Sequence, residues 1–234
     1  MQLIQRWLSK GFILPAATVC VLSIPISAAQ AALVTYSFTG DVSTLNGPLL
    51  SSSVGVGVGA PLSGTFTFDN SHATGGNYPG AVSGLTLQVG SYTVNFGIGA
   101  NAVTVFKGID LGNGFTGDRW KLDTAVAPQL NPMTMQPITL NGYSPFKFDL
   151  NLDREGSIFA NTDMQNPPSL SSLTGIRWRL LFDNTDGNVV SIRGSLNSLT
   201  AVPLPAAVLL FGAGLISLVG LGAGGLRNLR GSKA

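Results

Sequence analysis

The sequence predicts an all-β fold, an antiparallel β-sandwich of the jelly-roll type, in residues 32–202 of the 234-residue chain. Apolar and polar residues alternate with a period of two through most of this region, which is typical of strands with one buried face. Turn-forming residues separate the alternating segments, and no window has the spacing of an amphipathic helix. Two packed sheets would bury one face of every strand, so we expect a sandwich rather than a single open sheet.

Each strand can be followed by its apolar positions. We expect about nine or ten strands, with turns at 89–91, 153–156 and 183–188 and with loops at 40–61 and 125–137. An edge hairpin is the alternative for the first of these loops. In chain order, the alternating apolar residues are Val34, Tyr36 and Phe38; Phe66 and Phe68; Leu85, Leu87 and Val89; Tyr92, Val94, Phe96 and Ile98; Val103 and Val105; Trp120 and Leu122; Phe146, Phe148, Leu150 and Leu152; Ile176, Trp178, Leu180 and Phe182; and Val190 and Ile192.

The first 31 residues have the pattern of a secretory signal peptide. Arg6 and Lys10 precede an apolar run at 12–24, and the small residues Ala29 and Ala31 form an A-x-A site. We therefore expect signal peptidase to cleave after Ala31. A retained membrane anchor is the alternative, but the apolar run is shorter than the roughly 20 residues that a span needs.

The C-terminal segment 203–234 contains a predicted transmembrane helix. Residues 206–226 carry no charge, and a helix over them would be about 31 Å long, close to the thickness of a hydrocarbon core. Arg227, Arg230 and Lys233 follow at once and, by the positive-inside rule, hold this end in the cytoplasm. The precursor would then be anchored in the inner membrane with residues 32–202 outside it.

The junction before this helix carries a recognisable motif, made of Val202, Pro203, Leu204, Pro205 and Ala206. Followed by an apolar helix and a basic tail, it resembles the VPLPA-CTERM sorting signal, a variant of the PEP-CTERM group. The resemblance implies recognition by an exosortase-type protease in a Gram-negative envelope. It also implies cleavage near the two prolines and delivery to the cell surface or extracellular matrix, in a setting of surface polysaccharide or biofilm. A plain C-terminal anchor is the alternative.

Charge is distributed unevenly along the chain. The formal charge is +2, but five basic residues and no acidic ones lie in the two terminal segments, so residues 32–202 carry eight basic and eleven acidic residues, a formal charge of −3. A nucleic-acid partner is therefore not expected. Arg177 and Arg179 share one face of their strand, where they could meet an acidic polymer or be solvated.

No motif for catalysis is present. The only histidine of the mature region, His72, and the only glutamate, Glu155, both lie in segments of turn-forming residues. Neither has the partners that a nucleophilic triad or a pair of glycosidase carboxylates requires. We expect a non-enzymatic protein with no catalytic residue and no cofactor.

Two binding functions stay open as alternatives. The oxygen-rich loop 183–188 could hold calcium, although its residues are also ordinary turn formers. A carbohydrate could bind to exposed aromatic rings; Trp120 and Trp178 are in phase with core positions, whereas Tyr78 and Tyr143 lie in loops and are expected to be exposed. The sequence thus predicts an exported envelope or matrix protein, with a carbohydrate- or calcium-binding module at the cell surface as the alternative.

Overall fold

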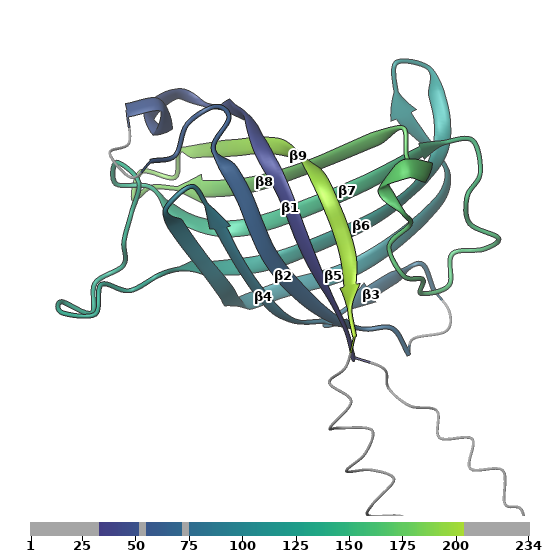
Figure 1. The fold of residues 1–234 in the computed structure, drawn as a ribbon, viewed down its shortest axis with the longest axis horizontal. Helices are drawn as coiled ribbons and strands as arrows, with labels where there is room; N and C mark the ends of the chain where they lie inside the picture. Colours follow the sequence, from purple (N-terminus) through teal and green to yellow (C-terminus); the bar gives the residue numbers. More distant parts are fainter. Residues whose placement is uncertain (1–32, 52–54, 72–74, 204–234) are drawn as a thin grey trace, which may run out of the picture.

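A computed structural model of the chain describes residues 33–51, 55–71 and 75–203 (Figure 1). These residues form nine strands and two short 3₁₀ helices, so the all-β prediction is confirmed. The elements are β1 (Leu33–Leu45), η1 (Gly47–Ser51), β2 (Pro61–Asp69), β3 (Asn77–Pro79), β4 (Val82–Val89), β5 (Tyr92–Gly112), β6 (Phe115–Pro128), β7 (Ser144–Glu155), η2 (Leu170–Ser172), β8 (Gly175–Asp183) and β9 (Val189–Val202).

The predicted signal peptide, the predicted transmembrane helix at 206–226 and the residue His72 lie outside the described residues. In the ranges that are described, no helix has the length and hydropathy needed to cross a membrane.

The strands form a closed antiparallel barrel, so the sandwich prediction is wrong. The sheet order is β5-β4-β2-β1-β9-β8-β7-β6, and β6 pairs back onto β5. The barrel closes because the long strand β5 pairs with two neighbours. Its first residues pair with β4 along one edge, and the strand pairs with β6 along the other edge. The segments expected as separate strands at 92–98 and 103–105 are both part of β5. The short β3 pairs with β5 further along the same edge as β4.

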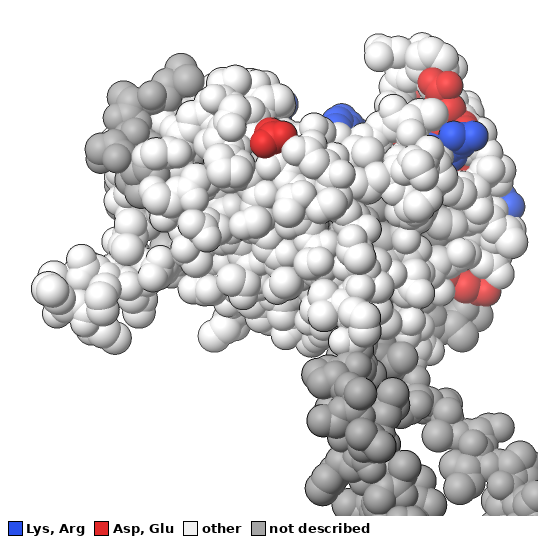
Figure 2. Space-filling view, in the orientation of Figure 1, with Lys and Arg blue, Asp and Glu red and all other residues white. Residues whose placement is uncertain are grey.

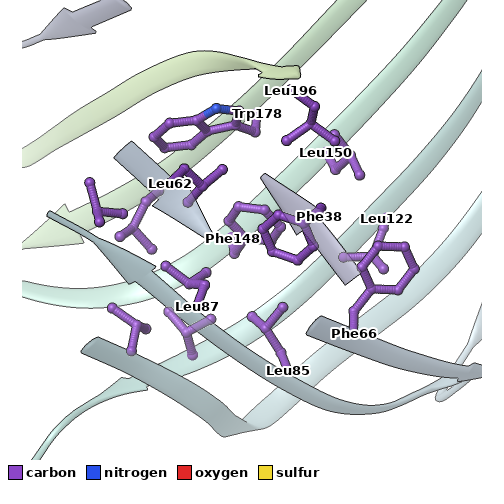
Figure 3. Packing of buried hydrophobic residues seen from close by; sticks show 14 of the residues in the cluster. Phe38, Leu62, Phe66, Leu85, Leu87, Leu122, Phe148, Leu150, Trp178 and Leu196 are labelled. Atoms are coloured by element: carbon purple, nitrogen blue, oxygen red, sulfur yellow. The ribbon is translucent and has the colours of Figure 1, made fainter. Parts of the chain in front are cut away.

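Side chains from opposite walls of the barrel meet in its middle. The Phe38 ring of β1 stacks on the Phe148 ring of β7, with the ring centroids 6.0 Å apart. The ring centroids of Phe66 in β2 and Trp120 in β6 are also 6.0 Å apart. Figure 3 shows Phe38 and Phe148 side by side among Leu62, Leu87 and other buried residues. These contacts make the centre of the barrel a packed hydrophobic core.

Large rings in the core lie opposite glycines on the neighbouring strand. Phe38 pairs with Gly64, and Trp178 pairs with Gly194. A Cβ atom on Gly64 would lie 2.6 Å from the Phe38 ring, and one on Gly194 would lie 2.8 Å from the Trp178 ring. Alternating small and large residues in this way fills the interior of a small barrel without steric overlap.

Several loop predictions need correction. The strand β1 continues to Leu45 and β6 continues to Pro128, so the segments 40–61 and 125–137 are partly strand. The segment 153–156 is not a hairpin turn, because β7 runs to Glu155 and a long connection with η2 precedes β8. The predicted turns at 89–91 and 183–188 are confirmed as the β4–β5 and β8–β9 connections.

The first and last strands of the barrel are neighbours. Thr35 of β1 pairs with Val202, the last residue of β9. The chain therefore enters and leaves the barrel at the same end (Figure 1).

Candidate ligand-binding face

Polar side chains on the outer side of β7 are unusually well buried. Phe148, Leu150 and Leu152 point into the core, so the residues between them, Asp149, Asn151 and Asp153, point outward. All three outward side chains are nonetheless buried. Long basic side chains of β6 and β8 cover them from either side, because these strands flank β7 in the sheet.

The two carboxylates of β7 are held by arginines. The Nε of Arg179 donates to both oxygens of Asp149 at 3.0 Å, and its terminal nitrogen donates to Oδ2 at 2.7 Å. Asp153 accepts hydrogen bonds from Arg119 at 2.6 and 3.0 Å and from Arg177 at 3.2 Å. The hydrogen bond to Asp153 raises the pKa of Arg119, and that to Asp149 raises the pKa of Arg179, in both cases against the opposite effect of burial.

Between these two carboxylates lies a neutral residue flanked by cations. Asn151 pairs in register with Lys121 of β6 and with Arg177 of β8. Its Oδ1 is buried and has no hydrogen-bond partner in the described structure. A buried polar atom without a partner is uncommon, so this amide is a candidate contact for a ligand.

A fourth arginine faces the same region without a carboxylate partner. Arg193 of β9 lies directly opposite Arg179 of β8, and like charges in such a pair repel each other. The Nε of Arg193 donates to Ser191 Oγ at 2.9 Å. Within the described ranges no carboxylate lies within ion-pair distance of Arg193.

These side chains surround an open pocket of about 380 Å³ on the outside of the barrel. Its size is near the lower end of the roughly 300–1,000 Å³ that is typical of small-molecule sites. We call this site the basic pocket. It is lined by Ser43, Thr44, Arg119, Lys121, Asn151, Arg177, Trp178, Arg179, Arg193 and Gly194.

Positive charge is concentrated on this side of the barrel. Of the eight basic residues in 32–202, six point outward from β6–β9, and five of these six form ion pairs with three carboxylates. By contrast, the surface over β1, β2 and β4 is almost free of charged side chains (Figure 2). The six basic residues are Arg119, Lys121, Lys147, Arg177, Arg179 and Arg193, and the three acidic ones are Asp123, Asp149 and Asp153.

The aromatic residues considered for sugar binding are all in the interior. Trp120 and Trp178 are fully buried, as predicted. Tyr78 and Tyr143 are buried too, so the prediction that they are exposed is wrong. Both were expected in loops, but Tyr78 lies in β3 and its hydroxyl donates to the Thr162 carbonyl at 2.9 Å. None of these four rings is an exposed platform for a sugar.

The loop considered for calcium is organised as a turn around Asn184. The side-chain Oδ1 of Asn184 accepts hydrogen bonds from the backbone N–H groups of Asp186 and Asn188 at 3.1 and 2.9 Å. In the part of the chain that the structure describes, no three His, Cys, Asp or Glu side chains gather closely enough to hold a metal ion.

Other residues singled out in the sequence are not brought together. Glu155 is exposed at the end of β7, beside a second pocket of about 250 Å³ that also touches Arg177. Of the five residues that resemble a sorting motif, Val202 and Pro203 are described, and Leu204, Pro205 and Ala206 lie outside the described residues. The same holds for Ala29, Ala31, Arg227, Arg230 and Lys233.

Sequence reasoning identified Arg177 and Arg179 as neighbours on one face but did not assign the other polar members of the basic pocket to a site. Lys121, Asn151 and Arg193 each occupy an outward position in an alternating strand, which was the available signal. The strand pairing that brings them together comes only from the structure.

In comparisons with known proteins, no family model, no curated protein and no solved structure matches this chain significantly.

Proposed function

We propose that this chain is an exported, non-enzymatic protein of a Gram-negative cell envelope or extracellular matrix. An exosortase-type system sorts it, and its barrel associates with surface polysaccharide. The observation that carries the proposal is the position of the sorting motif, whose first residue, Val202, is also the last residue of β9.

The geometry of the chain ends supports a barrel that is released by processing. All eight barrel strands lie between Leu33 and Val202. Cleavage after Ala31 and near Pro203–Pro205 would therefore remove no residue that takes part in the strand pairing. Because Thr35 and Val202 pair with each other, both proposed cleavage sites would adjoin the same end of the barrel.

The outer face supports binding rather than catalysis. Each buried carboxylate of β7 is engaged by arginine, so neither is a free base. Binding, in contrast, needs only a shaped and charged surface, which the basic pocket provides. This pocket favours the carbohydrate form of the binding-module alternative over the calcium form, because the oxygen-rich 183–188 loop uses Asn184 to close its own turn.

The sorting proposal can be tested by intact mass and location in cells that carry the sorting system. The native protein should be recovered at the surface or in the medium, beginning at residue 32 and ending near residue 203. A Pro203→Ala/Pro205→Ala variant should stay in the membrane with its C-terminus intact. The matched control is Pro167→Ala/Pro168→Ala, which also removes two prolines but should be processed normally. If the native protein keeps its full C-terminus, the segment is a plain anchor and the proposal is wrong.

A further inference from the structure

We propose that the basic pocket binds a carboxylate group of an acidic polysaccharide. The inference rests on the proposed function and specifies it further, because it names the chemical class of the polysaccharide and the residues that would bind it. Three features of the described residues carry it: a row of cations around a neutral amide, an arginine without a carboxylate, and a buried oxygen without a partner.

The charge pattern of β7 shows where an external anion would lie. Along its outward face, Asp149 and Asp153 each neutralise at least one arginine from β8. Asn151 lies between them and faces Lys121 and Arg177 across the sheet, but it has no charge to offer. Lys121 pairs instead with Asp123 of its own strand at 2.6 Å, and Arg177 reaches along the sheet to Asp153 at 3.2 Å. A ligand carboxylate placed over Asn151 would give both cations a second counter-charge, at the position where β7 supplies none.

The donors at this point suit a carboxylate. A guanidinium offers five N–H donors in a planar fork that can bind both carboxylate oxygens. Arg193 uses its Nε on Ser191, and no described carboxylate occupies its remaining donors. Arg177 makes one hydrogen bond to Asp153, and 60% of its side chain is exposed, so most of its donors face solvent.

The amide of Asn151 adds selectivity. The residue is only 8% exposed, lines the pocket, and has an unpartnered Oδ1. An amide can turn to present either its oxygen or its NH₂ group, since the two differ little in size. With the NH₂ group directed into the pocket it would donate to a carboxylate, and with the oxygen it would accept from a sugar hydroxyl.

A carboxylated polysaccharide fits this surface better than a nucleic acid. The fixed carboxylates Asp149 and Asp153 flank the site, and Glu155 lines the adjoining pocket beyond Arg177. A nucleic acid has a charge on every phosphate and needs a continuous basic surface, whereas residues 32–202 have a formal charge of −3. A polymer with carboxylates separated by neutral sugar atoms could place one of them in the pocket without bringing others near the fixed acids.

The test measures binding of the full-length protein, in detergent, to polygalacturonate at low salt. The native chain should bind this polymer, should release it as salt is raised, and should not bind neutral dextran. Arg193→Gln should weaken binding about tenfold or more, because a charge-assisted pair is lost. Lys107→Gln is the matched control: it also removes one positive charge, but from β5, outside the pocket, and binding should stay the same.

Asn151→Asp is the sharper variant because it changes the charge and hardly changes the shape. The new carboxylate would pair with Lys121 and Arg177, so binding of polygalacturonate should be lost while the melting temperature stays the same or rises. If Asn151→Asp instead lowers stability, Arg193→Gln still decides the matter, because the Arg193 side chain is exposed and its removal leaves the core intact.

Four outcomes would overturn the proposal: no binding by the native chain, unchanged binding by both pocket variants, an equal loss in Lys107→Gln, or tighter binding of dextran sulfate or single-stranded DNA than of polygalacturonate. The sorting experiment is independent of these. A processed protein that does not bind polygalacturonate would disprove the site and leave the sorting proposal standing, and a binding but unprocessed protein would do the reverse.

Discussion

Asp149 and Arg179 lie directly opposite each other on β7 and β8 and are joined by three N–H···O contacts of 2.7–3.0 Å. The carboxylate is fully buried, yet it lies on the outer side of the barrel, where the arginine covers it. A buried carboxylate is costly unless it is paired and hydrogen-bonded, so the outer layer of this barrel depends on the arginine.

Arg179→Leu should therefore destabilise the barrel by about 2–3 kcal/mol. The value is set below the roughly 3–5 kcal/mol for breaking a fully buried pair because 41% of the Arg179 side chain is exposed. The free energy of unfolding in urea measures this change. The double variant Asp149→Leu/Arg179→Leu should recover most of the loss, since it leaves no buried charge without a partner. Equal losses in the single and double variants would contradict this account.

Asp118 provides a prediction on pH. Burial raises its pKa, but the N–H groups of Phe159, Gly108 and Ile158 and the Ser157 hydroxyl donate to the carboxylate and together lower the pKa below its ordinary value. The stabilisation is thus fully present above the ordinary pKa of about 3.9 and is lost as pH falls through the lower, folded-state pKa.

Asp118→Asn should cost about 1–3 kcal/mol at pH 7, because its NH₂ group cannot accept the hydrogen bonds that the carboxylate accepts. Urea unfolding from pH 7 down to pH 3 checks this, and the difference from the native protein should shrink below about pH 4 as Asp118 protonates. Asp110→Asn, an exposed position on the same β5–β6 hairpin, is the control and should change stability little. A constant difference over the whole range would show that the charge of Asp118 is not the cause.

Gly194→Ala should strongly destabilise the barrel. The added methyl group would overlap the Asp41 carbonyl oxygen and would lie 2.8 Å from the Trp178 ring. Overpacking of this kind costs about 1–3 kcal/mol or more. Gly84→Ala is the matched control, because the nearest atom to its new methyl group is 3.8 Å away. Thermal unfolding of the two variants should differ clearly, and equal melting temperatures would contradict the packing described here.

The three methionines in the described part of the chain should be oxidised in a fixed order. Met133 and Met135 lie in the β6–β7 connection and are 93% and 65% exposed, whereas Met164 is partly buried against the core. Hydrogen peroxide should convert the first two to sulfoxides before Met164 reacts. Peptide mass spectrometry measures the order, and the melting temperature should hold until Met164 is modified. Early oxidation of Met164 would mean that the 156–174 connection opens readily.

Strand positions could be predicted from the sequence, but the way the strands close could not. Alternation shows which side chains face a core, and Phe148, Leu150 and Leu152 are buried as expected. Alternation does not show which strands pair at the edges of a sheet, so a sandwich and a barrel have the same pattern. The closure depends on β5, whose glycines and exposed Ile98 hid the continuity of one long strand.

The candidate site shows the same limit. Arg177 and Arg179 could be placed on one face because they are two residues apart in one strand. Their partners Asp153 and Asp149, and the proximity of Arg193 and Asn151, depend on the register between strands, which single-sequence periodicity does not specify. The prediction that Tyr78 is exposed was wrong for a related reason. Its neighbours in the sequence are rich in glycine and proline, which indicates a loop, but in the folded chain the ring is buried.

The pairing of β1 with β9 also bears on how the barrel forms. Ser37 and Thr200 are 163 positions apart in the chain, yet they are register partners. Contacts between such distant residues are slow to form, because a long loop must close first. Until β9 has been synthesised and has docked, β1 and β8 both have unpaired edges that can capture strands of other chains. Loss of β9 should therefore favour aggregation over a shortened barrel, and the last strand acts as the closing seam of the fold.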